Sequence, residues 1–302
     1  MHSQAERMNA RIGLPPQLKQ WLLHNIDRGI PPAPLARGMV EQGFDAGVAA
    51  ALAHTVWAAR AIGAAVPDEA IDAEQIAAAV YRREASRLSP ANTIALGDAS
   101  VRVAVRLESP SLAVLDDVLH ADECAQLMAL AAPRLAPSTI VDPLSGLDLT
   151  SASRSSDSMF FRPQENPLVA RIDRRVSQLM NLPIEHGEGL QVVRYRGASS
   201  SAPHYDFLMP SNGANIASLA RSGQRVSTLV MYLNDVAEGG ETLFPESGFG
   251  VTPRRGGALY FEYCNSDGQL DPQSLHAAAP VTAGEKWIVT KWMRQRPFTS
   301  AG

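Results

Sequence analysis

Two histidines and one aspartate have the types and spacing of a metal site. His204 and Asp206 stand two residues apart, and His276 follows far along the chain. In a β-strand, residues i and i+2 point to the same face, so we expect His204 and Asp206 to reach one metal ion from one strand, with Tyr205 pointing away. Two imidazoles and one carboxylate are the facial triad that holds non-haem Fe(II) and leaves positions open for reactants. The pattern therefore predicts an open, catalytic iron centre rather than a closed structural one.

A lysine after the distal histidine suggests a cosubstrate. Lys286 lies ten residues beyond His276 and offers a compact positive charge that can pair with a carboxylate. With the iron ligands, it predicts hydroxylation that uses 2-oxoglutarate and dioxygen. Lys291 lies further along the same predicted strand, but residues i and i+5 point to opposite faces. Lys286 is therefore the better candidate for the cosubstrate.

Short segments around these residues predict a β-rich fold. The first is apolar enough for a buried strand, the second is a glycine turn that leads into a strand, and the last two are further strands. The segments are 225–234 (RVSTLVMYLN), 238–245 (EGGETLFP), 256–263 (GGALYFEY) and 284–292 (GEKWIVTKW). Several short strands with such turns are typical of an all-β barrel or sandwich.

The region 111–298 resembles the catalytic domain of prolyl 4-hydroxylase α-subunit-like enzymes. The matching stretches include SRSSDSMFF, LQVVRY, APHYDF, VSTLVMYLNDVAEGGETLFP and SLHAAAPVTAGEKWIVTKWMRQRPF. The resemblance implies an α+β fold, in which helices pack on a double-stranded β-helix (jelly roll). It implies a 2-oxoglutarate-dependent dioxygenase that uses Fe(II), 2-oxoglutarate and O2, with ascorbate as the reductant.

The resemblance also implies the catalytic residues. His204, Asp206 and His276 match the iron ligands. Lys286 matches the residue that pairs with the distal carboxylate of 2-oxoglutarate. These four positions are intact in this sequence, which favours an active enzyme over a catalytically silent binding protein.

Further pocket residues follow from the same resemblance. Tyr195 matches a position whose hydroxyl helps to hold the distal carboxylate, and Thr242 and Trp292 match cofactor-pocket positions. Arg154 matches the arginine of a loop that contacts peptide substrate, with Ser155 where the family usually has threonine. Tyr195 and Trp292 are also expected to contact substrate. The segment 208–224, rich in small polar residues, corresponds to a mobile loop that closes over the substrate.

Composition and charge predict a soluble enzyme with no nucleic-acid partner. The chain has 302 residues, with 27 basic and 31 acidic side chains and a formal net charge of −4. The sequence contains no basic stripe for nucleic acid, no apolar start typical of a secretory signal and no apolar run long enough for a membrane span. The two cysteines, Cys124 and Cys264, predict no disulfide framework. We expect a cytoplasmic location.

Three regions are expected along the chain. Residues 1–65 form a helical module, in which three helices resemble small modules of the ubiquitin-associated type. The module is expected either to bind a protein partner or to pack on the catalytic core, with Trp21 and Trp57 as packing anchors. Residues 66–110 form a connector with a helix over 68–88 and a strand over 100–107. Residues 111–302 form the dioxygenase domain.

The substrate class is the last expectation. Arg154 and the long segment over 208–224 belong to the peptide-binding version of the fold, so we expect hydroxylation of a prolyl residue in a peptide or protein, with succinate and CO2 as coproducts. The alternative is hydroxylation of a free amino acid or another small molecule, because one fold serves many substrates.

Overall fold

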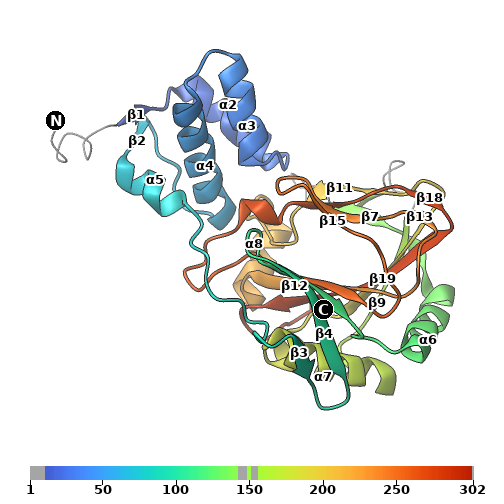
Figure 1. The fold of residues 1–302 in the computed structure, drawn as a ribbon. Helices are drawn as coiled ribbons and strands as arrows, with labels where there is room; N and C mark the ends of the chain where they lie inside the picture. The colour runs from blue at the N-terminus through green and yellow to red at the C-terminus, as the bar shows by residue number, and fades with distance from the viewer. Residues whose placement is uncertain (1–10, 142–147, 151–155, 301–302) are drawn as a thin grey trace.

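The computed structural model describes residues 11–141, 148–150 and 156–300. A helical region packs at one corner of a β-rich body, and the two are joined by an extended connection (Figure 1). The β-rich body has one large sheet and one small sheet facing each other, with helices on the outer side of the large sheet. This arrangement confirms the predicted double-stranded β-helix with packed helices.

The helical region consists of α2 (Pro16–Asp27), α3 (Pro32–Glu41) and α4 (Ala46–Ile62). Proline stands in the first turn of α2 and α3, where its missing N–H is not needed. The carboxylate of Asp45 caps α4 by accepting the Val48 N–H at 3.0 Å. Gly63, with φ of 73°, ends α4 in the left-handed conformation that favours glycine.

The helix predicted over 68–88 is much shorter in the structure. β2 (Ala70–Ile71) pairs with β1 (Ile12–Gly13), and α5 spans only Ala73–Ala79. Beyond α5 the chain bonds to the barrel instead of to itself. The backbone N–H of Arg82 donates to Gln269 Oε1 at 3.0 Å, and that of Arg87 donates to Glu262 Oε1 at 2.8 Å. Helix propensity was overridden by these tertiary contacts.

The large sheet has nine strands in the order β3-β4-β5-β16-β12-β19-β10-β9-β6. Their bounds are Thr93–Ala95, Ser100–Leu107, Leu112–Asp116, Ala258–Glu262, Arg225–Tyr232, Glu285–Arg294, Leu190–Arg196, Ser156–Phe161 and Ala136–Pro137. The strands predicted around 225–234, 256–263 and 284–292 are confirmed as β12, β16 and β19. The strand predicted over 100–107 is β4, so the connector contributes two strands to the main sheet.

The small sheet has the order β11-β17-β14-β15. Its strands are Ser201–His204, His276–Ala278, Thr242–Phe244 and Phe249–Val251. Two short antiparallel pairs lie apart from it: β13 (Glu238–Gly239) with β18 (Val281–Ala283), and β7 (Thr139–Val141) with β8 (Asp148–Thr150).

Helices α6 (Ala121–Ala131) and α7 (Pro167–Met180) lie on the outer side of the large sheet (Figure 1). Asp122 lies in the first turn of α6, where a negative charge interacts favourably with the helix dipole. The chain also contains short 3-10 turns, namely η1 (Ala132–Arg134), η2 (Ile184–His186) and η3 (Pro272–Ser274). Cys124 and Cys264 are buried and free. Among the helices described here, none is long and apolar enough to cross a membrane.

Candidate active site

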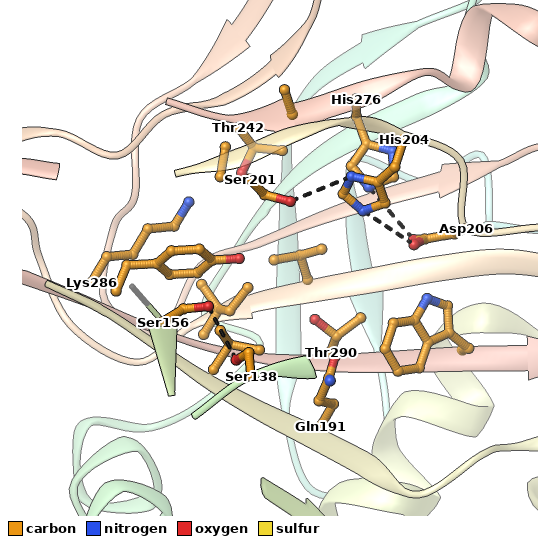
Figure 2. Close-up of a pocket in the computed structure, with 17 residues that line it drawn as sticks. Ser138, Ser156, Gln191, Ser201, His204, Asp206, Thr242, His276, Lys286 and Thr290 are labelled. Atoms are coloured by element: carbon orange, nitrogen blue, oxygen red, sulfur yellow. Dashed lines mark hydrogen bonds and ion pairs between the residues drawn. The ribbon is translucent and has the colours of Figure 1, made fainter. Parts of the chain in front are cut away.

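The three predicted metal ligands meet between the two sheets. His204 ends β11 and His276 begins β17, and these two residues are paired across the small sheet. His204 Nε2 lies 3.8 Å from Asp206 Oδ1, and His276 Nε2 lies 3.7 Å from Asp206 Oδ2. One ligand atom from each residue lies within 4.8 Å of the other two (Figure 2). Separations of this size suit three ligands around one ion.

One detail of the sequence prediction was wrong. Asp206 is not on the strand that carries His204, because β11 ends at His204 and Asp206 lies in the bend that follows. The bend is held by Arg225, whose Nη1 donates to the Asp206 carbonyl oxygen at 3.1 Å. Tyr205 still points away from the metal ligands and stacks on Phe207, with ring centroids 4.4 Å apart.

Backbone carbonyls orient the imidazoles. His204 Nδ1 lies 2.9 Å from the Ala202 carbonyl oxygen, and His276 Nδ1 lies 3.0 Å from that of Ser274. A hydrogen donated from Nδ1 leaves the Nε2 lone pair free for a metal, the usual arrangement of ligating histidines. The ring of Phe261 packs edge-on against His276, with centroids 4.8 Å apart, and limits the ring's movement.

The Asp206 carboxylate is held in its charged form. The hydroxyl of Thr228 donates to Asp206 Oδ2 at 2.7 Å, and Thr228 in turn lies 3.0 Å from the Tyr263 hydroxyl. Burial acts to raise the pKa of Asp206, but His276 and His204, together with Arg225 and Thr228, lower it overall. A buried anion beside two imidazoles fits a divalent cation.

Lys286 lies at the other end of the same pocket (Figure 2). It is 1% exposed, and its ammonium lies 5.4 Å from the ring centroid of Tyr195 and 5.8 Å from that of Tyr232. No carboxylate lies within ion-pair distance of Lys286 among the described residues. Burial lowers its pKa to about 8, and Glu241 opposes this only in part. The pocket therefore offers a desolvated cation with no counter-ion, as an anionic cosubstrate needs.

The other predicted pocket residues also line this cavity. Tyr195 pairs with Lys286 across β10 and β19. Thr242 is buried, and its hydroxyl lies 3.0 Å from that of Tyr232. Trp292 lines the cavity near the metal ligands, and its Nε1 is buried without a hydrogen-bond partner among the described residues. Arg154, with Ser155, lies outside the described residues.

Lys291 points away from the pocket, as its register predicted. Its ammonium donates to Asp173 Oδ1 at 2.7 Å and to the Glu188 carbonyl oxygen at 2.5 Å, and the Lys291 and Asp173 side chains are each 1% exposed. Lys291 therefore has an ion-pair partner inside the protein, whereas Lys286 has none among the residues that the structure describes.

Sequence reasoning missed several residues of the site. Polar side chains from β9, β10, β19 and the segment after β6 also line the cavity, namely Ser156, Gln191, Thr290 and Ser138. Alternation along β19 could have found one of them, because Lys286, Thr290 and Trp292 are separated by even numbers of residues and share one face.

A buried ionic network behind the metal ligands was also missed. Glu188 accepts two hydrogen bonds from Arg225, at 2.7 and 2.8 Å, and one from Arg294 at 3.0 Å. The Arg225 guanidinium stacks 4.2 Å from the ring centroid of Trp292. Arg225 therefore contacts both the Asp206 backbone and a pocket-lining ring. The presence of charged residues within strands that we predicted to be buried could have indicated this ionic network.

The segment 208–224, which we expected to be a mobile loop, is partly helical. It contains α8 (Gly213–Ser222), which Asn212 caps by accepting the Asn215 N–H at 2.9 Å. The ends of the segment are tied together, because the Gln224 side chain bonds both the N–H of Leu208 and its carbonyl oxygen, at 2.7 and 2.8 Å. Arg294 Nη2 donates to the Ser218 carbonyl oxygen at 3.0 Å.

The fold and the site together define a class. A double-stranded β-helix that carries two histidines, one aspartate and an unpaired buried lysine in one pocket is an Fe(II)- and 2-oxoglutarate-dependent oxygenase. Residues 190–294 match the family model described as the 2OG-Fe(II) oxygenase superfamily, and they include His204, Asp206, His276 and Lys286.

Similar proteins narrow the class further. Prolyl 4-hydroxylase 1 of Arabidopsis thaliana is 39% identical over 234 residues, which cover 72% of this chain and 80% of that protein. Prolyl 4-hydroxylase subunit alpha-2 of Gallus gallus is 33% identical and covers 63% of this chain, but only 35% of that longer protein is matched. A solved structure, the viral collagen prolyl hydroxylase of Paramecium Bursaria Chlorella virus-1, is 26% identical, with a TM-score of 0.47, and covers 61% of this chain and 95% of that one. This chain belongs to the prolyl 4-hydroxylase family of 2-oxoglutarate-dependent dioxygenases.

Proposed function

We propose that this enzyme hydroxylates a prolyl residue in a peptide or protein and converts 2-oxoglutarate to succinate and CO2. The observation that carries the proposal is the pairing of the metal triad with Lys286 at opposite ends of one buried pocket. A cosubstrate with a keto acid at one end and a carboxylate at the other matches these two ends. The choice of a prolyl residue as substrate follows from the similarity to proteins named prolyl 4-hydroxylase.

Each pocket residue receives one role in this proposal. His204, Asp206 and His276 hold Fe(II), which with 2-oxoglutarate supplies the activation of dioxygen when bound. Lys286 holds the distal carboxylate, assisted by the Tyr195 hydroxyl. Thr228 holds the carboxylate of Asp206 in place, and its own hydroxyl is fixed by Tyr263.

Further residues limit the volume of the pocket in which the cosubstrate and the substrate would react. Thr242 and Trp292 limit the volume beside the cosubstrate and exclude water from it. Trp292 is fixed by the Arg225 guanidinium stacked on its ring. We assign peptide contacts to Arg154, Tyr195 and Trp292, and we expect the segment 208–224 to close over the bound peptide.

Some features of the whole protein also belong to this proposal. We propose ascorbate as the reductant that restores Fe(II) and the cytoplasm as the compartment. We keep 1–65 as the helical module, 66–110 as the connector and 111–302 as the catalytic domain.

Peptide hydroxylation tests the proposal. The purified protein is incubated with Fe(II), 2-oxoglutarate and proline-rich peptides, and mass spectrometry locates any added oxygen. The proposal expects one added oxygen on proline for each succinate formed. Succinate formation that rises with a free amino acid, but with no proline-rich peptide, would replace it with a small-molecule oxygenase.

A further inference from the structure

A groove of about 460 Å³ lies between the N-terminal helices and the barrel. One side is formed by alanines of α4 and α5, and the other by the chain just before β17, including Asp271 and Pro272. The Tyr205 hydroxyl donates to the Pro272 carbonyl oxygen at 3.2 Å. Because Tyr205 directly follows His204, the groove lies against the outer side of the wall that carries the metal ligands.

The groove contains a buried carboxylate with no counter-ion. Asp271 is 4% exposed, and its Oδ1 accepts the Gln273 N–H at 2.9 Å. Its Oδ2 has no hydrogen-bond partner, and Asp271 makes no ion pair, within the part of the chain that the structure describes. Buried carboxylates are normally paired with a cation. The unpaired carboxylate of Asp271 is therefore a candidate to bind a cationic ligand. Burial raises the pKa of Asp271 to about 6.

The groups facing Asp271 do not supply the missing charge. Burial lowers the pKa of His54, which keeps this groove residue neutral near pH 7. Burial raises the pKa of Tyr81, and the charge of Asp271 adds to the effect. Arg87, which like Asp271 acts on Tyr81, forms an ion pair with Glu262 instead, with Nη1 2.7 Å from Oε2. The groove is therefore apolar in lining and negative in charge.

We propose that this groove binds the side chain of a lysine or arginine in the polypeptide substrate, at a position separate from the prolyl residue in the metal pocket. The methylene groups would pack against Ala50, Ala51 and Ala79, and the cationic head would reach Asp271 Oδ2. A hydrogen bond between charged groups is stronger than one between neutral groups. The proposal rests on the proposed function, because it takes the substrate to be a polypeptide that can span both sites.

Matched peptides test the proposal in the full-length protein. A proline-rich peptide carries one lysine, placed at a series of distances from the proline, and its partner carries norleucine, which keeps the methylene chain but not the charge. Dissociation constants are measured by fluorescence anisotropy. We expect a preference for lysine of roughly tenfold at one or more spacings. Asp271→Asn, which keeps an acceptor for the Gln273 N–H, should abolish that preference.

Two further variants complete the test. Asp45→Asn is the matched control, because Asp45 also accepts one backbone N–H at a helix start but lies outside the groove; it should keep the preference. Ala79→Arg places a guanidinium beside the groove at the half-buried end of α5 and should abolish the preference by occupying Asp271. This variant keeps the proposal testable where Asp271→Asn does not fold.

The outcomes separate this proposal from the proposed function. Equal affinity for the lysine and norleucine peptides at every spacing would overturn the groove proposal, even with normal hydroxylation of proline. Binding of the Nα-acetyl methylamide of lysine, but not that of norleucine, with loss in Asp271→Asn, would support the groove even where no proline is hydroxylated.

Discussion

The indole of Trp57 packs against the phenol of Tyr205, with ring centroids 5.7 Å apart. Trp57 belongs to α4 of the helical region, and Tyr205 stands between the metal ligands His204 and Asp206. Trp57 also lies 6.0 Å from the ring of Phe207. At the end of α4, Gly63 lies so close to Pro210 that an added Cβ would be 3.1 Å from Pro210 Cγ. The helical region therefore packs directly on the segment that carries Asp206.

Trp57→Ala should weaken both the fold and the metal site. Trp57 is 2% exposed, and a buried Trp→Ala change costs about 3–5 kcal/mol in the free energy of unfolding. Fe(II) affinity should fall as well, since the bend at Tyr205 loses its support, and Trp57→Phe should restore most of it. Thermal unfolding and Fe(II) titration, at a temperature where every variant is folded, check this.

Trp21→Ala is the matched control for this prediction. Trp21 lies on α2 of the same helical region but is 41% exposed, and it makes none of the ring contacts to Tyr205 and Phe207 that Trp57 makes. Its removal should change neither property by much. If folded Trp57→Ala binds Fe(II) as tightly as the unmodified protein does, the helical region does not support the metal site.

Thr228→Val should lower Fe(II) affinity. The change removes the hydrogen bond to Asp206 Oδ2 and keeps the branched shape. Loss of such a partner typically lowers metal affinity roughly 10- to 100-fold. Ser227→Ala is the control, because the neighbouring Ser227 hydroxyl is buried without a hydrogen-bond partner among the described residues. Isothermal titration with Fe(II) should separate the two, and equal affinities would remove Thr228 from the site.

The affinity for 2-oxoglutarate should fall as the pH rises above about 8. Lys286 has a pKa of about 8 in the folded protein, below its ordinary value, so it loses its charge in this range. A neutral amine attracts a carboxylate weakly, so the dissociation constant should rise by up to about tenfold per pH unit. Lys286→Arg should bind less tightly near neutral pH but show a flat profile, because its guanidinium stays charged.

The same shift has a consequence for stability with the opposite sign. Between pH 8 and 10.5, the ordinary pKa of a lysine, the unfolded chain holds the Lys286 proton and the folded chain does not. Unfolding therefore takes up a proton, and this group's contribution to the free energy of unfolding rises with pH across that window. The affinity prediction has its own contradicting outcome. If the affinity for 2-oxoglutarate stays constant up to pH 9.5, a residue other than Lys286 holds the distal carboxylate.

The segment that contains α8 should respond to substrate. Hydrogen exchange over 213–222 should slow when a proline-rich peptide and an inert analogue of 2-oxoglutarate bind together, as expected for a lid. Arg294→Met should speed exchange there in the free protein, since Arg294 donates to the Ser218 carbonyl oxygen. Exchange that is already slow in the free protein and unchanged on binding would contradict a lid role.

The metal ligands could be predicted from residue type and spacing, although Asp206 lies in a bend and not on the strand that carries His204. The choice of Lys286 over Lys291 could be predicted from strand alternation. The same alternation placed Lys291 on the opposite face, where it pairs with Asp173. The bend at Asp206 could not be predicted, because it depends on Arg225, which comes from another strand. The spacing of the two histidines and the aspartate therefore indicated which residues form the site. Contacts with residues distant in the sequence determine how these side chains are positioned.

The helical region was harder to predict than the barrel. Capping at Asp45 and glycine at Gly63 give α4 clear limits in the sequence. The region from Val80 to Arg87 looks helical in composition, yet it is drawn out along the barrel by bonds to Gln269 and Glu262. Contacts between residues so distant in sequence carry no local signal. A role for these helices in binding a protein partner stays a prediction.

Anaerobic titration of Fe(II) and 2-oxoglutarate, followed by visible absorption, tests the central claim most directly. Chelation of Fe(II) by the keto acid in the protein gives a metal-to-ligand charge-transfer band that neither component shows alone. We predict the band in the unmodified protein and in Ser227→Ala, its absence in Asp206→Ala, and a shift to higher 2-oxoglutarate concentration in Lys286→Ala. A band of normal intensity and affinity in folded Asp206→Ala would contradict the proposed site.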